Sequence, residues 1–232
     1  LEAPEIIYNP DLKEYYLFVS YDPLMTTYNV RVGRSDKAEG PFIDYFGKEL
    51  KDTTNNFPIL TAPYRFKSHP GWAGTAHCAV FTSDDGQYFM AHQGRLSPQN
   101  QMMDLHVRQV FFTKDGWPVV SPERYAGSNP REFSAADLVG EWEIIRVQEP
   151  LYERKQEAGQ ILWGEGELQD EEWNMSHLLY LEKDGKLGED QGTWDFAKED
   201  QSLQLTLNGE VVKNLIVFAG HDWENETETV LF

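Results

Sequence analysis

The sequence predicts an all-β protein. Short runs of alternating apolar and polar residues recur along the chain, pairs of turn residues separate them, and helix-type periodicity is scarce. Aromatic residues make up 13% of the 232 residues and include seven tryptophans, which is enough apolar material for a sizeable core. The strand-like runs fall into two parts of different composition.

The first part contains two sets of four strand-like runs. The first set reads EIIYNP, EYYLFVSYD, YNVRVGRSD and PFIDYF, and the second reads TAHCAVFTSD, YFMAHQGR, LHVRQVFFTKDG and WPVVSP. Asp85-Gly86 and Asp115-Gly116 separate neighbouring runs, as hairpin turns do. Four antiparallel strands per unit are typical of a propeller blade, and a sandwich of eight strands fits the pattern equally well. Because two blades cannot close a ring, a propeller needs further blades from outside this chain.

The second part reads as a meander of short strands that closes into a small barrel. Leu203, Leu205 and Leu207 alternate with polar residues, and Asn208-Gly209 then marks the clearest hairpin of the sequence. Asp184-Gly185 marks another hairpin. We expect residues 1–125 to form about two blades, residues 126–136 to form a turn-rich linker, and residues 137–232 to form the barrel.

The charge of the chain also differs between its two parts, and its sign argues against nucleic acids and anionic membranes as partners. The net charge is −19; residues 1–132 have 13 basic and 16 acidic side chains, whereas residues 133–232 have 7 and 23. Such a chain repels the phosphates of nucleic acids and anionic membranes, so we expect no nucleic-acid partner. No apolar run is long enough to span a membrane, so we also expect no membrane insertion. The single cysteine, Cys78, allows no intrachain disulfide. The chain begins at Leu1 inside a strand-like run, so we expect the natural N-terminus to lie elsewhere.

Four segments, in order along the chain, resemble glycoside hydrolase family 43. They are LEAPEIIYNP with YYLFVSYD, TYNVRVGRSDKAEGPFID, GTAHCAVFTSDDGQYFMAHQGR, and LHVRQVFFTKDGWPVVSP. The second and third together are most similar to the endo-α-1,5-L-arabinanases of that family. The tail from LVGEWEIIRV to GTWDF resembles the lipocalin-like barrel of the longer arabinanases. The resemblance implies the C-terminal blades of a five-bladed β-propeller followed by that accessory domain.

The resemblance implies that Glu2, in its EAP context, is the general acid of an inverting hydrolysis. The acid protonates the leaving oxygen while a second carboxylate activates water. Glu5 is a nearby competitor at a position where the family tolerates other residues. The family's base and its tuning aspartate precede the matched segments, and Asp11, Asp22 and Asp36 lie in no matching context. An N-terminal segment or chain of the same enzyme is therefore the expected partner.

His77 matches a histidine that helps hold a metal ion near the propeller axis in long arabinanases. The resemblance implies Ca²⁺, or another metal ion, bound largely through waters. Calcium prefers oxygen ligands, so one imidazole is an unusual ligand. An inward-facing histidine without a metal is the alternative. Cys78 stands where the family more often has Asn.

Tyr28, Asn29, Trp72 and Arg108 are the candidates for contact with sugar. Tyr21 is a further aromatic that could stack on a sugar ring, although aromatics also fill the space between blades. His106 and Arg108 are two apart on one strand, so they share a face that either binds hydroxyls or forms a polar stripe. His92 is a weaker candidate. The remaining tryptophans read as packing residues: Trp142, Trp163, Trp173, Trp194 and Trp223.

The expected function is cleavage of internal α-1,5-L-arabinofuranosyl linkages in arabinan, a calcium-associated activity that is complete only with the N-terminal part. An exo-acting α-L-arabinofuranosidase or β-xylosidase, and a non-catalytic carbohydrate-binding protein, are the alternatives.

The acidic tract 165–173 lacks the ligand spacing of a calcium loop and reads as a solvated loop. Because arabinan is a plant cell-wall polymer, we expect an extracellular or periplasmic bacterial enzyme.

Overall fold

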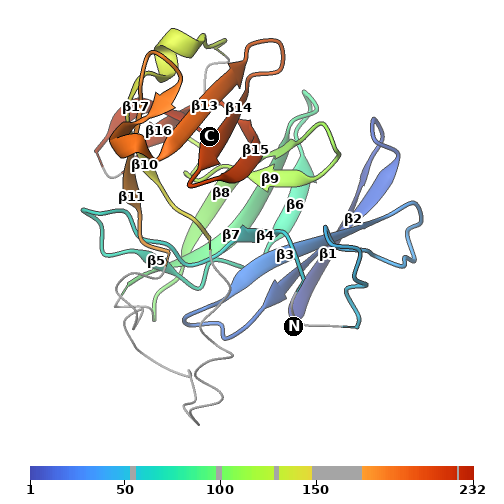
Figure 1. Ribbon diagram of the computed structural model, residues 1–232. Helices are drawn as coiled ribbons and strands as arrows, with labels where there is room; N and C mark the ends of the chain where they lie inside the picture. The colour runs from blue at the N-terminus through green and yellow to red at the C-terminus, as the bar shows by residue number, and fades with distance from the viewer. Residues whose placement is uncertain (53–55, 98–100, 128–130, 148–173, 224) are drawn as a thin grey trace. The chain divides into compact units, whose positions relative to one another are not determined.

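The computed structural model describes residues 1–52, 56–97, 101–127, 131–147, 174–223 and 225–232 (Figure 1). The strands confirm the predicted all-β class. Contacts divide the chain into two units, Leu1–Val107 with Ile145–Met175 and Arg108–Ile144 with Ser176–Phe232. The acidic tract 165–173, together with Trp163 and Trp173, lies outside the described residues. Among those described, no helix is long and apolar enough to cross a membrane.

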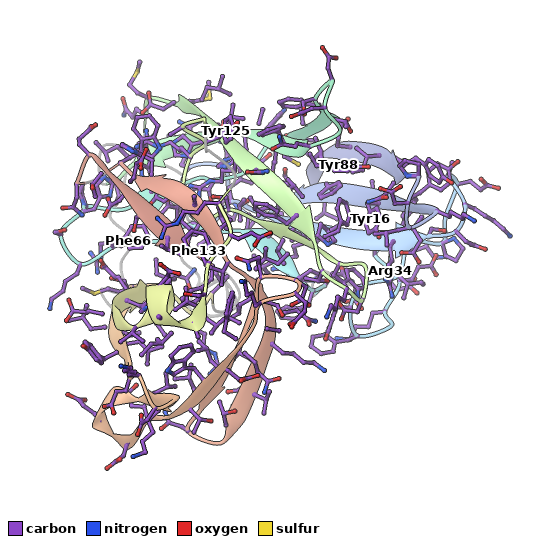
Figure 2. All side chains as sticks on the ribbon, turned by 90° about the horizontal axis from the view of Figure 1, so that it is seen from above. Tyr16, Arg34, Phe66, Tyr88, Tyr125 and Phe133 are labelled. Atoms are coloured by element: carbon purple, nitrogen blue, oxygen red, sulfur yellow. The ribbon has the colours of Figure 1, made fainter. Side chains whose placement is uncertain are left out.

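The first sheet has four antiparallel strands in chain order: β1 (Glu2–Asn9), β2 (Glu14–Tyr21), β3 (Asn29–Ser35) and β4 (Ile59–Thr61). On one face of β2, Tyr16, Phe18 and Ser20 are fully buried. Tyr16 pairs with Arg34 across β2 and β3, and Figure 2 shows both side chains. The Tyr16 hydroxyl donates to Glu14 Oε2 at 3.1 Å, and Arg34 approaches the same oxygen at 3.3 Å. Alternate side chains of β2 therefore lie on a buried face and on a partly exposed face.

Strand β3 is buried on both faces. Val30 and Val32 lie on one face, and Asn29 and Arg31 on the other are also buried. A Cβ at Gly33 would overlap the side chain of Leu50. Glycine at this position therefore lets the loop that contains Leu50 pack against β3.

The strand predicted from PFIDYF is wrong. Within residues 41–46 only Ile43 pairs, as an isolated bridge to Arg34 and Glu49, and β4 completes the sheet instead. The reason is Asp44, whose Oδ1 accepts hydrogen bonds from the backbone N–H groups of Phe46 (2.9 Å) and Lys48 (2.8 Å). Local side-chain bonds of this kind favour a turn over an extended strand.

The second sheet contains both predicted hairpins. Its path is β5-β7-β8-β9, and β6 also pairs with β7. The strands are β5 (Trp72–Ala73), β6 (Ala79–Thr82), β7 (Tyr88–Leu96), β8 (Asp104–Phe112) and β9 (Pro118–Val120). Gly86 and Gly116 adopt positive φ angles of 83° and 79° in the turns between β6 and β7 and between β8 and β9. The contact-based division of the chain falls within β8.

The second unit is built on a six-stranded antiparallel meander in chain order. Its strands are β10 (Gly140–Ile144), β11 (His177–Leu181), β12 (Lys186–Leu187), β13 (Gly192–Ala197), β14 (Ser202–Leu207) and β15 (Glu210–Ile216). A separate hairpin follows, formed by β16 (Phe218–Asp222) and β17 (Thr227–Leu231). Two short 3-10 helices are η1 (Ala135–Leu138) and η2 (Gly188–Asp190).

The turn chemistry of the meander confirms the hairpin predicted at Asn208-Gly209. Leu207 pairs with Glu210, and the two central residues have φ angles of 49° and 84°. Two successive positive φ angles match the right-handed twist of the flanking strands, and Asn-Gly tolerates them best. The predicted Asp184-Gly185 turn likewise joins β11 and β12, with Gly185 at φ 81°.

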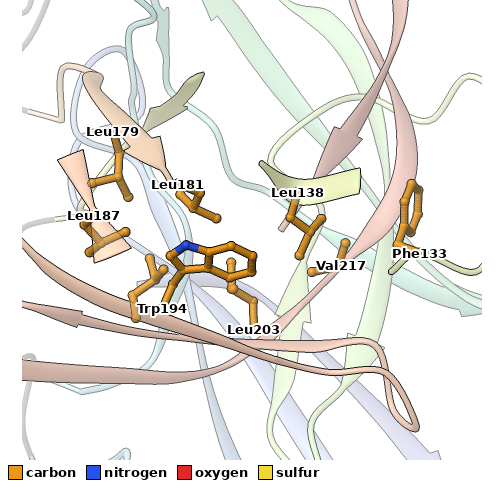
Figure 3. Close-up of a cluster of buried hydrophobic side chains, with 9 residues drawn as sticks. Phe133, Leu138, Leu179, Leu181, Leu187, Trp194, Leu203 and Val217 are labelled. Carbon is orange, nitrogen blue, oxygen red and sulfur yellow. The ribbon is translucent and has the colours of Figure 1, made fainter. Parts of the chain in front are cut away.

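One cluster of apolar side chains forms the core of this unit (Figure 3). Leu203 and Leu205 are buried and Leu207 packs against them, as their alternation predicts. The cluster also includes Phe133, Leu138, Leu179, Leu181, Leu187, Trp194 and Val217. Trp142 and Trp194 act as packing residues whose indole N–H groups donate to the carbonyls of Leu138 and Glu182. Phe133 falls in the predicted linker yet contributes to this core; the proposed boundaries at 125 and 137 stay predictions.

Leu203→Ala should lower the free energy of unfolding by about 2–5 kcal/mol, because it leaves a cavity in a packed core. Gln204→Ala is the matched control: the neighbouring side chain points to solvent, so the change should stay within about 0.5 kcal/mol. Urea unfolding of the three proteins measures both values. Equal losses for the two variants would contradict the alternation of β14.

Candidate functional site

Glu2 lies at the start of β1, where an irregularity in the pairing aims its side chain. Glu2 pairs with Ser20 and Glu5 with Phe18, so three steps along β1 match two along β2. Ala3, inside this bulge, has a φ of 49°. Bulges re-aim side chains and recur beside active sites. The Glu2 side chain is 51% exposed, so its carboxyl group is open to solvent on one side.

Tyr28 holds the Glu2 carboxylate. Its hydroxyl donates to Glu2 Oε1 at 2.5 Å and lies 3.3 Å from Nδ1 of His77. The ring itself is 1% exposed, so the phenol is fixed by packing. Burial, followed by the hydrogen bond to Glu2, raises the pKa of Tyr28. The hydroxyl therefore keeps its proton and remains a donor to Glu2.

His77 completes a three-residue group. Its Nδ1 lies 4.0 Å from Glu2 Oε1, and its side chain is 58% exposed. The backbone N–H of His77 donates to Ser20 Oγ at 2.9 Å, which ties the residue to the centre of β2. His77 has a φ of 57°, a left-handed conformation that costs energy for a residue with a Cβ. Non-glycine residues in this conformation are concentrated at functional sites.

The segment before His77 is fixed by backbone bonds. Gly74, with a φ of 59°, donates to the carbonyl of Thr26, and its missing Cβ would lie 2.6 Å from the carbonyl oxygen of Leu24. Thr61 Oγ1 donates to the carbonyl of Thr75 at 2.5 Å. Gly74 allows the chain to pass close to residues 24–26, and the bond from Thr61 fixes Thr75. Together these contacts position the imidazole of His77.

Asn29 lies inside the first sheet, fully buried. Its Nδ2 donates to Asp22 Oδ2 at 2.6 Å, and its Oδ1 accepts from Arg31 Nε at 2.9 Å. Arg31 also donates to the carbonyl of Asn56 and lies over the ring of Tyr21, 4.8 Å from its centroid. Asp22 is therefore part of a buried polar network. The contact of Asn29 with substrate stays a prediction, and the bonds found here are structural ones.

Trp72 is 5% exposed and packs among imidazoles. Its ring stacks on His69 with a centroid distance of 5.6 Å and meets the edge of His106 at 4.5 Å. His92 and His106 are buried and lie 5.2 Å apart. A Cβ at Gly94 would lie 2.5 Å from the His106 ring, so glycine makes room for it.

Arg108 lies in the second unit and is 3% exposed. Its guanidinium donates to the carbonyl of Ser121 at 3.0 Å and to that of Pro122. These bonds fix the chain after β9. The structure thus brings together Glu2, Tyr28 and His77, while Asn29, Trp72 and Arg108 lie in packed surroundings.

Ser20 is the site residue that sequence reasoning did not find. It is fully buried, pairs with Glu2 and accepts the bond from His77. A hydroxyl that follows Tyr16 and Phe18 on the same face of the strand EYYLFVSY is the sequence feature that could have indicated it. His77 stays a predicted metal ligand, and the described residues contain no cluster of three or more His, Cys, Asp or Glu side chains that could hold a metal ion.

Cys78 should resist modification in the folded protein. The thiol is 5% exposed, and burial raises its pKa to about 12, so it stays protonated well above neutral pH. Ellman's reagent at pH 8 should detect no thiol in the native chain and one after unfolding in guanidinium. Rapid reaction of the native protein would contradict this burial.

Asn29→Ala should destabilise the fold by about 1–3 kcal/mol, because it leaves buried polar atoms of Asp22 and Arg31 without that partner. Asn225→Ala, at an exposed position, is the control and should change stability by less than about 0.5 kcal/mol. Guanidinium unfolding in the absence of any sugar measures both. An unchanged stability for Asn29→Ala would favour a role in binding alone.

Comparison with known proteins agrees with the fold. Residues 122–232 match a family model, GH43_C, described as a C-terminal lipocalin-like domain. The solved endo-1,5-α-L-arabinanase of Thermotoga petrophila has the same fold over 99% of this chain and 51% of its own, with a TM-score of 0.79 and 23% identity. A glycoside hydrolase family 43 protein from Bacillus licheniformis matches with the same TM-score, identity and coverage.

Two curated relatives have names that describe an activity. The extracellular endo-α-(1→5)-L-arabinanase 2 of Bacillus subtilis is 31% identical over 63% of this chain and 35% of its own length. The extracellular endo-α-(1→5)-L-arabinanase of Thermotoga petrophila is 29% identical over 62% and 34%. The chain thus spans about a third of the length of these relatives. It is homologous to the C-terminal part of the endo-α-1,5-L-arabinanases, and its residues 122–232 match the GH43_C model of lipocalin-like domains.

Proposed function

We propose that this chain is part of a glycoside hydrolase that cleaves internal α-1,5-L-arabinofuranosyl linkages of arabinan, with Glu2 as its general acid. The proposal depends on one observation: the carboxyl group of Glu2 accepts a hydrogen bond from the buried Tyr28, while the Glu2 side chain is about half exposed to solvent. The names of the homologous arabinanases supply the substrate.

The geometry suits transfer of a proton from Glu2. Oε1 accepts the bond from Tyr28, which leaves Oε2 to carry the proton that passes to the glycosidic oxygen. As that proton moves, the bond between the anomeric carbon and the oxygen breaks, and a water attacks from the opposite face. A second carboxylate removes the proton of this water, and the product is inverted. We assign that base to an N-terminal part of the enzyme outside this chain.

His77 is the residue to which we assign the metal. With Nδ1 beside Tyr28, the more distant Nε2 is the nitrogen that can face a cation such as Ca²⁺, whose other ligands are then waters. When bound, the cation supplies positive charge near the reacting sugar. The role of His77 itself is to present one nitrogen from a rigid backbone position.

Two further aspects follow from the relatives. The names of the curated homologues include the word extracellular, and we propose secretion on that basis. An exo-acting enzyme is the second candidate, because an exo-α-(1→5)-L-arabinofuranosidase of Cellvibrio japonicus is 28% identical over 52% of this chain. Product analysis separates them: an endo enzyme releases mixed oligosaccharides from linear arabinan, whereas an exo enzyme releases short products of one size.

Glu2→Gln should lower the rate on linear arabinan by about 10²–10⁴-fold, the contribution of a general acid. On an aryl arabinofuranoside with a strongly acidic leaving group, which needs no protonation, the loss should be much smaller. The enzyme that carries this chain together with its N-terminal part is assayed on both substrates. Glu5→Gln is the control and should retain near-normal rates. Equal losses on both substrates for Glu2→Gln would contradict the role of general acid.

In the same assay, Tyr28→Phe should lower kcat on arabinan by about 10- to 100-fold with little change in KM, because Glu2 loses the bond that orients it. On the activated substrate the loss should again be small. Phenylalanine fills the same buried space, so thermal unfolding should confirm that the fold is retained.

A further inference from the structure

The second unit contains a cavity of about 320 Å³, remote in sequence from Glu2 and His77. It is lined by the hairpin β16–β17, by Gln109 of β8 and by the chain that follows β9. Tyr125 and Phe133, labelled in Figure 2, come from this last segment. Pockets for small ligands start at about 300 Å³, so the volume suits a molecule of one or a few sugar rings.

One wall of the cavity is held rigidly. The guanidinium of Arg124 lies over the ring of Trp223, 5.0 Å from its centroid, and the ring of His221 meets the same indole at 4.8 Å. The indole N–H of Trp223 donates to the carbonyl of Arg124 at 2.9 Å. Trp223 therefore orients two polar side chains of the lining, and groups oriented before binding lose little entropy on binding.

The polar groups of the lining are mixed in chemistry. His221 and Glu228 face each other as partners across β16 and β17. Guanidinium groups donate, a carboxylate accepts, and an imidazole does both. A site for an anion would contain donors alone, and residues 133–232 have 7 basic against 23 acidic side chains, which disfavours an anion further. Hydroxyl groups, which both donate and accept, match this mixture.

Apolar groups form the rest of the lining. Phe218 and Leu231, a pair across the same hairpin, contribute apolar surface, and Tyr125 is an aromatic that is 38% exposed. Sugars present C–H groups beside hydroxyls, so a lining of this dual kind suits them better than a purely apolar or purely ionic ligand.

We propose that this cavity is a second carbohydrate site, which takes one or a few arabinofuranosyl units of the polymer that the enzyme cleaves. The identity of the sugar rests on the proposed function. The site anchors substrate without taking part in the cleavage, so it raises the local concentration of polymer at the enzyme.

Titration calorimetry of the 232-residue chain with α-1,5-L-arabinotriose tests the proposal. Ala126→Trp, at an exposed lining position, should fill the cavity and lower the affinity at least tenfold, and Glu228→Gln should do the same. Glu141→Gln, an exposed carboxylate on β10, is the matched control and should bind within twofold of the parent. Thermal unfolding of each variant should show that the fold is retained. Binding that is unchanged in Ala126→Trp and Glu228→Gln overturns the proposal.

Hydrolysis assays of the complete enzyme separate this proposal from the proposed function. Cleavage of arabinan by the parent, with no effect of Ala126→Trp on arabinotriose affinity, overturns the second site and leaves the function intact. Arabinotriose binding that Ala126→Trp abolishes, in an enzyme with no activity on arabinan, supports the site and contradicts the function. In the outcome that we expect, Ala126→Trp weakens action on polymeric arabinan and leaves the rate on an aryl arabinofuranoside unchanged.

Discussion

The register of β1, β2 and β3 is the constraint on which the candidate site depends. Ser20 pairs with Glu2 on one side and with Val30 on the other, so residues distant in sequence meet around the end of β2. Tyr28, just before β3, then donates a hydrogen bond to the Glu2 carboxylate. A slip of one residue would turn each side chain to the opposite face. The buried pattern of Tyr16, Phe18 and Ser20 opposes such a slip, because it would move the aromatic rings into water.

The buried face of β3 shows how the unit stabilises polar residues away from water. Asn29 and Arg31 share partners in a network that reaches Asp22 and Asn56, and Asn56 Nδ2 donates to Asp44 Oδ2 at 3.2 Å. Each bond satisfies a group that would be costly to bury alone. The same Asp44 terminates the extended chain after Phe42, so one carboxylate connects the turn to the interior. Burial also raises the pKa of Tyr21, within this network, to about 12.

The hairpin β16–β17 contributes both to the apolar core and to the cavity of the second unit. Its apolar cluster is contributed mainly by strands of the meander, and the alternation of β14 accounts for two of the buried leucines. The hairpin β16–β17 packs Ala219 and Val230 against that cluster. Ala219 and Val230 also line the cavity together with His221 and Glu228, and the indole of Trp223 packs against His221. A packed core beside a small cavity is an arrangement in which side chains keep fixed positions before any ligand arrives.

The sequence by itself determined the all-β class, most of the strands, and the hairpins at Asp85-Gly86, Asp115-Gly116, Asp184-Gly185 and Asn208-Gly209. These features depend on local chemistry: alternation selects a face, and turn residues tolerate positive φ. The resemblance of its motifs also singled out Glu2 and His77. Only the tertiary structure decided what surrounds them, because the hydrogen bonds of Tyr28 and Ser20 join residues 26 and 57 positions apart. The cavity wall likewise joins Arg124 to Trp223 across 99 positions, a contact that no local pattern in the sequence encodes.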